Sequence, residues 1–143
     1  MKLFDTWRTP EVHADVDPGF WAAEAQAMQR ILRSTMLSGE RRLAAIPARL
    51  EFTAGLEGRV VVLWRNTIAG FVPGDRAAAL RQQLAEAGDA RLVAEGEVRE
   101  HSGLFRIWVG SWPGSAVPAP PSDEIAPEPT RILGIPLTGT GGS

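Results

Sequence analysis

The chain has 143 residues but no cysteine and no tyrosine, and its only histidines are His13 and His101. The absence of cysteine excludes disulfides, thiolate metal sites and a cysteine nucleophile. Two histidines are also a poor supply for a histidine-based metal centre. We therefore expect neither a metal nor another cofactor.

Long hydrophobic runs are absent as well. The N-terminus has no apolar run of signal-peptide length, and no later run approaches the roughly 20 apolar residues that span a bilayer. We expect one soluble, cytoplasmic domain with tails and without a membrane partner, because 143 residues with 44% hydrophobic content suffice for one core.

Lysine is nearly absent, since 14 of the 15 basic residues are arginine, and the net charge is −2. That balance gives no global reason to expect a polyanionic partner. Between positions 18 and 113, however, arginines exceed acidic residues by 12 to 10. Arginine suits bidentate contacts with phosphate, so a nucleic-acid partner stays open.

The N-terminal third predicts an irregular arm over residues 1–16, followed by a helix. Asp17-Pro18 is a helix-start signal, and Gly39 is a stop signal after about Leu37. Five apolar residues between them have the spacing of one helical face: Trp21, Ala25, Met28, Leu32 and Met36. The arginines at positions 30, 33, 41 and 42 predict a solvated face that complements the dipole of the helix C-terminus.

The middle of the chain predicts strands. Residues 48–53, 59–64 and 67–72 are rich in β-branched and aromatic side chains, and the short Arg65-Asn66 turn favours a meander. A second helix is predicted over 76–87, with Asp75 as N-cap and Gly88 as stop. Strands 90–99 and 103–112 then form a hairpin.

Composition changes sharply after Pro113. Residues 114–130 predict an extended, Pro-rich linker, and 131–143 a short apolar segment with a flexible tail. The segment "RILGIPL" contains Ile132, Leu133, Ile135 and Leu137. Two interpretations stay open: it folds back onto its own domain, or it docks on a partner or a neighbouring copy as an added strand.

No catalytic motif is present. The chain lacks the GxSxG, HExxH and GxxxxGK patterns. Glu95 and Glu97, with Glu51 nearby, are typical of a wet sheet face rather than of an acid/base pair, because nothing predicts an apolar pocket to separate their pKa values. His101 falls in a polar hairpin turn. We therefore expect a protein that is not an enzyme.

The junction "RNTIAGFVPGDRAAAL" is the candidate binding site. A helix N-terminus presents unpaired N–H groups to anions, and Arg65, Phe71, Gly74 and Arg76 surround this one. A cap by Asp75 would occupy one of those donors, which favours a structural corner. Trp108 and Trp112 share the less buried face of the last strand, so they are candidates for a partner surface or for covering by the C-terminal arm.

The order of elements over about residues 46–113 resembles the HIRAN domain, in particular the stand-alone HIRAN-like modules of actinobacterial proteins. The run Ile68-Ala69-Gly70-Phe71-Val72-Pro73 stands where that family has a V-G-Y-L-P strand end, and 77–84 where it has an Ala-rich helix. The resemblance implies an SH3-like or OB-like barrel and, in helicase-linked members, binding of single-stranded DNA ends. Residues 53–58 lack the Asn and Asp of the family's nucleotide-contacting segment.

The sequence thus predicts an α+β domain: a five-stranded bent sheet or small barrel, an N-terminal amphipathic helix, and one helix between strands three and four. The predicted function is non-catalytic binding of single-stranded nucleic acid or phosphate. The alternative is a protein-interaction or assembly subunit that docks through its N-terminal arm and the "RILGIPL" segment, including as a homo-oligomer.

Overall fold

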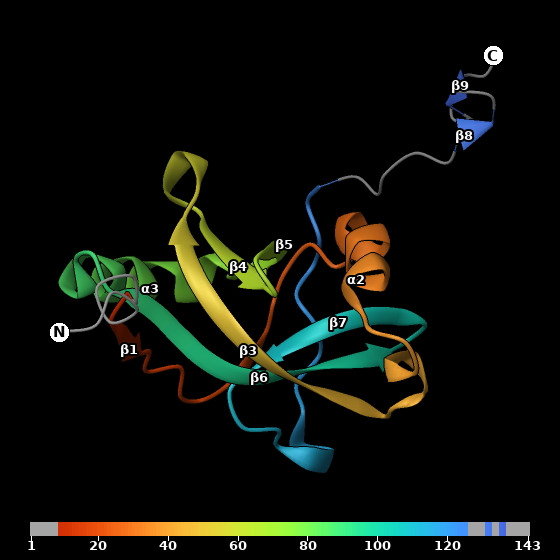
Figure 1. Cartoon of the computed structure of the whole chain (residues 1–143), viewed down its shortest axis with the longest axis horizontal. Helices are drawn as coiled ribbons and strands as arrows, with labels where there is room; N and C mark the ends of the chain where they lie inside the picture. Colours follow the sequence, from red (N-terminus) through yellow and green to blue (C-terminus); the bar gives the residue numbers. More distant parts are fainter. Residues whose placement is uncertain (1–8, 126–130, 133–134, 137–143) are drawn as a thin grey trace, which may run out of the picture.

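A computed structural model describes residues 9–125, 131–132 and 135–136 of the chain (Figure 1). Its main feature is one curled, seven-stranded sheet with two helices, which confirms the α+β class and the barrel-like shape. The strand order is β2-β7-β6-β3-β4-β5, and β1 lies beside β6. The bounds are β1 Glu11–His13, β2 Phe20–Trp21, β3 Ala45–Ala54, β4 Val60–Trp64, β5 Thr67–Phe71, β6 Arg91–His101 and β7 Leu104–Val109.

Two long strands produce the curl. β6 pairs with β3 over most of its length, and from Gly96 onward its other edge pairs with β7. A Cβ at Gly96 would collide with the carbonyl oxygen of Trp108, so only glycine allows this close approach of the two backbones. At the far ends of the strand order, Ala23 and Phe71 exchange two backbone hydrogen bonds, with N···O distances of 2.6 and 3.2 Å. The sheet therefore curls until its end strands meet.

The core lies inside this curl. Alternate residues of β3, β4, β6 and β7 belong to one buried hydrophobic cluster, as the period of a strand requires. Helix α2 (Gln29–Thr35) packs against β5 and β7 and buries Leu32. Helix α3 (Gly74–Ala87) packs against β3, β4 and β6 and buries Ala77 and Leu80. The largest fully buried core side chains include Leu50, Phe52, Trp64, Leu92 and Ile107.

The predicted meander, second helix and final hairpin are confirmed as β3–β5, α3 and β6–β7. Asn66 has the predicted positive φ, 63°, and Gly88 ends α3 with φ 60°. The N-cap prediction is wrong, because α3 begins at Gly74 and Asp75 lies inside its first turn. A carboxylate there still stabilises the helix through its dipole.

The predicted N-terminal helix from Asp17 to Leu37 is wrong in its first half. Phe20–Trp21 form β2, and helical structure begins only with the 3-10 turn η1, Gln26–Met28. Residues 20–25 are all buried, so this segment lacks the solvent-exposed face that an amphipathic helix would have. Their backbone finds hydrogen-bond partners on β7 and β5 instead. The spacing of Trp21 and Ala25 matched a helical face by coincidence.

The predicted irregular arm is wrong where the structure describes it. Glu11–His13 form β1, which pairs in parallel with Arg91–Val93 at the free edge of β6. Residues 1–8 lie outside the described residues. The domain therefore uses its N-terminal segment to extend the sheet to seven strands, two more than the sequence predicts.

The C-terminal region also differs from a simple linker. Residues 113–125, here called the strap, contain the short turn η4 (Gly114–Ala116) and then run extended along the domain to the side of α2 (Figure 1). Beyond them β8 (Arg131–Ile132) pairs with β9 (Ile135–Pro136) in a separate two-stranded sheet. Leu133 and Leu137 of the predicted docking segment lie outside the described residues.

Candidate functional site

The strap is held by two carboxylates that are far apart in sequence. Asp123 accepts the backbone N–H of Glu24 through Oδ1 at 2.7 Å and that of Gln26 through Oδ2 at 3.0 Å. Oε1 of Glu24 in turn accepts the N–H groups of Glu124 at 2.9 Å and Ile125 at 2.7 Å. These four bonds are here called the carboxylate clasp.

The clasp supplies hydrogen-bond acceptors for backbone N–H groups that have no acceptor within their own segment. Gln26 begins η1, whose N-cap residue, Ala25, has no side-chain oxygen to bind the unpaired N–H groups of the helix start. Asp123 supplies that cap from the strap. Glu24 is only 1% exposed, and its second oxygen pairs with Nη2 of Arg59 at 3.2 Å. A buried carboxylate is costly unless it is paired and hydrogen-bonded, and Glu24 is both.

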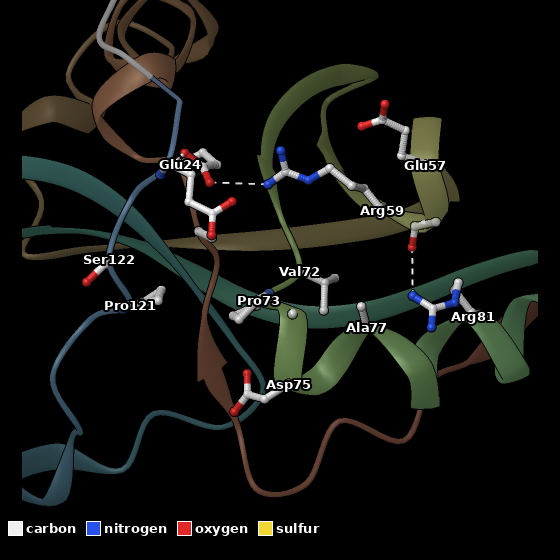
Figure 2. A pocket seen from close by; sticks show the side chains of 14 residues that line it. Glu24, Glu57, Arg59, Val72, Pro73, Asp75, Ala77, Arg81, Pro121 and Ser122 are labelled. Atoms are coloured by element: carbon white, nitrogen blue, oxygen red, sulfur yellow. Dashed lines mark hydrogen bonds and ion pairs between the residues drawn. The ribbon is translucent and has the colours of Figure 1, made fainter.

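A pocket of about 350 Å³ lies beside the clasp, at the predicted strand-to-helix junction. Figure 2 shows Arg59 pointing toward Glu24 and Arg81 pointing toward the chain at Gly58, whose carbonyl oxygen it binds at 2.7 Å. The charged lining residues are Glu24, Glu57, Asp75, Glu124, Arg59 and Arg81. Four acids against two arginines disfavour a phosphate in this pocket.

Arg65, a predicted site residue, is engaged inside the molecule. Its guanidinium donates two hydrogen bonds of 2.7 Å to the Glu40 carboxylate and one of 3.2 Å to the carbonyl of Thr35. It also lies over the Trp64 ring at 4.5 Å. The hydrogen bond from Arg65, helped by one from the N–H of Leu37, lowers the pKa of Glu40 to about 2. Arg65 therefore ties the end of α2 to the barrel.

Arg76, the second predicted arginine, is engaged elsewhere. Its Nη2 donates to the carbonyl oxygens of Val16 and Pro18, and the guanidinium lies 4.7 Å from the centre of the Phe20 ring. It thus positions the segment that enters β2. The described contacts give Arg65 and Arg76 different partners on different segments, and neither lines the pocket.

The other two predicted residues do adjoin the pocket. Gly74 lines it directly, and Phe71 lies under the Arg59 guanidinium, 4.2 Å from the ring centre. Sequence reasoning missed Glu24, Arg59 and Asp123. One signal was available for Glu24: it is the only charged residue between Pro18 and Arg30, and residues 19–25 are otherwise apolar.

The predicted partner-surface tryptophans belong to a second feature. Trp21, His101, Trp108 and Trp112, here called the tryptophan cluster, pack ring against ring. The Trp21 ring centre lies 5.2 Å from Trp108 at 87° and 5.6 Å from Trp112 at 70°. Trp108 is buried, and its Nε1–H donates to the carbonyl of Ser111 at 2.9 Å. The Nε1–H of Trp21 donates to the carbonyl of Pro118 in the strap, also at 2.9 Å.

Carboxylates on the sheet are paired with arginines, across neighbouring strands for Glu51 and within β6 for Glu97. Arg91 donates to Glu51 from Nε at 3.0 Å and from Nη2 at 2.7 Å, and this contact raises the pKa of Arg91. Arg99 pairs with Glu97 at 2.7 Å. In the part of the chain that the structure describes, no three His, Asp or Glu side chains gather as metal ligands would.

Comparison with protein-family models, with curated proteins and with solved structures finds no match to this chain. The resemblance to the HIRAN domain therefore stays a prediction. Among the described helices, none is both long enough and apolar enough to cross a membrane.

Proposed function

We propose that this protein is a non-catalytic protein-interaction module, in which the barrel-like domain presents its C-terminal segment, residues 126–143, to a partner. The observation that carries the proposal is the carboxylate clasp. Because Glu24 holds the N–H groups of Glu124 and Ile125, the segment that follows departs from a fixed point on the domain.

The chemistry of that segment favours docking. Ile132 and Ile135 pair across β8 and β9, and these strands pair with each other rather than with the seven-stranded sheet. An isolated two-stranded hairpin is at best marginally stable in water, so it gains stability from an apolar partner surface. The five residues 126–130 span at most about 18 Å, which limits how far from the clasp docking occurs.

The test is the oligomeric mass of the full chain by light scattering over a range of concentrations. A second copy is the simplest partner, so the full chain is expected to form a dimer that Ile132→Asp/Ile135→Asp abolishes. The matched control is Thr130→Asp/Thr138→Asp, which adds the same charge to the same segment. A full chain that stays monomeric at all concentrations contradicts self-association. Truncation must follow Ile125, because removing the strap also destroys the clasp.

A second candidate function is binding of single-stranded nucleic acid, and charge on one segment favours it. Residues 26–45 carry four arginines and one acidic residue, Glu40, whose charge Arg65 already neutralises. The four arginines, at positions 30, 33, 41 and 42, are exposed along α2 and the turn η2, Glu40–Arg42. Arg41 donates to the carbonyl of Arg33 at 3.1 Å, and Arg33 lies over the Phe105 ring. All four side chains are nevertheless exposed, so the patch suits phosphates better than the predicted Arg65–Arg76 pair.

The experiment is titration of a labelled oligonucleotide at several salt concentrations. If nucleic acid binds through this patch, Arg41→Ala/Arg42→Ala is expected to lower the affinity. It is also expected to reduce the slope of log K against log salt concentration by the amount that corresponds to about two phosphate contacts. Arg49→Ala/Arg91→Ala is the matched control, since it removes the same charge from the sheet. Equal binding by both double variants, or none at low salt, removes this candidate.

A further inference from the structure

The strap has the properties of a polyproline II ligand. Its first nine residues, "PGSAVPAPP", contain four prolines, and they end in the PxxP pattern Pro118-Ala119-Pro120-Pro121. Val117 has φ −62° and ψ 131°, close to the polyproline II values of about −75° and +145°. Residues that precede proline are restricted to this region of φ and ψ. The backbone conformations of Val117, Ala119 and Pro120 are therefore largely determined before any contact forms.

The surface beneath the strap is aromatic and rigid. The ring centre of Trp21 lies 5.1 Å from His101, 5.2 Å from Trp108 and 5.6 Å from Trp112. The Arg99 guanidinium lies over the Trp112 ring, 3.8 Å from its centre, and adds a cation–π contact to the cluster. Packing of this kind holds the cluster in one arrangement before a peptide arrives.

One hydrogen bond joins the two features. A polyproline II helix makes no internal hydrogen bonds, so its carbonyl groups need donors from outside. The indole N–H of Trp21 donates to the carbonyl of Pro118 at 2.9 Å. An aromatic surface that contacts prolines and donates to a peptide carbonyl is a recurring way to recognise Pro-rich segments.

We propose that the tryptophan cluster is a binding site for Pro-rich peptides in the polyproline II conformation, occupied here by the chain's own Pro118–Pro121. A Pro-rich segment of a partner protein takes the same place when the strap leaves. The site goes beyond the docking of residues 126–143, because it uses a different surface and a different ligand chemistry.

Charge on the same face of the sheet indicates the preferred ligand. Arg106 lies two residues before Trp108 on β7, so strand alternation puts both side chains on one face. Arg99, directly opposite Arg106 on β6, is paired with Glu97, so the charge on this face without an ion-pair partner in the described contacts is that of Arg106. Arg106 is 9% exposed, and among the described residues its Nε and Nη1 have no hydrogen-bond partner. A Pro-rich ligand with an acidic residue supplies the missing acceptor.

The carboxylate clasp decides when a partner can bind. The strap continues from β7 in the same chain, so its binding is intramolecular, with an effective concentration on the order of millimolar, and the clasp at Glu24 fixes its far end on the domain. A free peptide therefore competes poorly with the intact strap. Releasing the clasp without touching the tryptophan cluster opens the site.

The experiment measures binding of a fluorescent peptide, "PGSAVPAPP", to full-length variants by fluorescence anisotropy. Asp123→Ala removes two bonds of the clasp, so it is expected to bind the peptide at least about tenfold more tightly than the parent chain. Asp89→Ala, which removes an exposed carboxylate beyond α3, is the matched control and is expected to bind like the parent. A peptide with alanine at all four proline positions is expected not to bind.

Two further variants separate recognition from folding. Pro118→Ala/Pro120→Ala/Pro121→Ala weakens the strap but leaves the clasp residues intact, so it is also expected to admit the peptide. Trp21→Phe in the Asp123→Ala background removes the indole donor and is expected to lower the affinity about fivefold. The proposal is overturned if folded Asp123→Ala and the proline triple variant both bind no better than Asp89→Ala, or bind the alanine peptide equally well.

Discussion

The carboxylate of Asp123 accepts the backbone N–H of Glu24 across 99 positions of sequence, at 2.7 Å. The carboxylate of Glu24 in turn accepts hydrogen bonds from the N–H groups of the two residues that follow Asp123. The bridge between Ala23 and Phe71, where the curled sheet meets itself, comes directly before Glu24 in the chain. The strap thus fastens the domain where its end strands join.

Removing either side of the clasp is expected to destabilise the domain. Asp123→Ala leaves two N–H groups without their acceptor, at a cost of about 1–3 kcal/mol. Glu24→Ala does the same for two others. The double variant is expected to lose less than the sum of the singles, because either change releases the same strap. Urea denaturation of the four proteins measures this coupling, and strict additivity would contradict a single clasp.

Stability at acid pH is expected to depend on the Glu40–Arg65 pair. The folded pKa of Glu40, about 2, lies below its ordinary value of 4.5, because Arg65 stabilises the carboxylate. The pair therefore contributes fully above about pH 5 and loses its contribution as the pH falls toward 2. In urea denaturation at a series of pH values, Glu40→Gln is expected to be less stable than the parent near neutrality. The difference should shrink between pH 4.5 and 2.

Two glycines give a matched pair of substitutions. A Cβ at Gly96 would strike the backbone of Trp108, so Gly96→Ala is expected to cost more than about 2 kcal/mol. A Cβ at Gly74 meets nothing within 4 Å, and Gly74→Ala is expected to stabilise the protein by about 0.4–1 kcal/mol, because alanine lowers the conformational entropy of the unfolded chain. Thermal unfolding of both variants checks the prediction. A mild effect at Gly96 would argue against the close approach of β6 and β7.

Arg106→Met is expected to stabilise the free protein and weaken its ligand binding. Burying a guanidinium with unpaired donors costs about 1–3 kcal/mol, and an apolar chain of similar length avoids that cost. In the Asp123→Ala background, the variant should lose any preference for an acidic Pro-rich peptide over a basic one. Reduced stability on substitution would show that Arg106 has a structural role.

Much of the fold was predictable from local sequence. The strands from Ala45 to Phe71 are rich in β-branched and aromatic residues and are separated by turn residues, and Gly88 ends α3 where expected. These signals depend on a few neighbouring residues, so tertiary contacts do not change the local structure that they predict. The N-terminal segment did not follow its helical spacing, because residues 20–23 gain hydrogen bonds from β7 and β5 that no local pattern encodes.

The candidate site was less predictable. Composition identified residues 114–130 as Pro-rich and extended, but their docking depends on a tryptophan and a glutamate about 100 positions earlier. The sequence indicated anion binding at Arg65 and Arg76. In the structure, Arg65 donates to the Glu40 carboxylate, and Arg76 donates to the carbonyl oxygens of Val16 and Pro18. Pairing of this kind is set by tertiary contacts, which a single sequence does not display.

Native-state hydrogen exchange of the Glu124 and Ile125 amides tests most directly that the strap belongs to the fold. Both N–H groups donate to the buried Glu24 carboxylate, so they are expected to exchange as slowly as the amides of Ala23 and Phe71 at the barrel seam. In Glu24→Ala this protection should disappear from the strap while the α3 amides keep theirs. Exchange of Glu124 and Ile125 at the rate of an unfolded peptide in the parent chain would contradict the clasp.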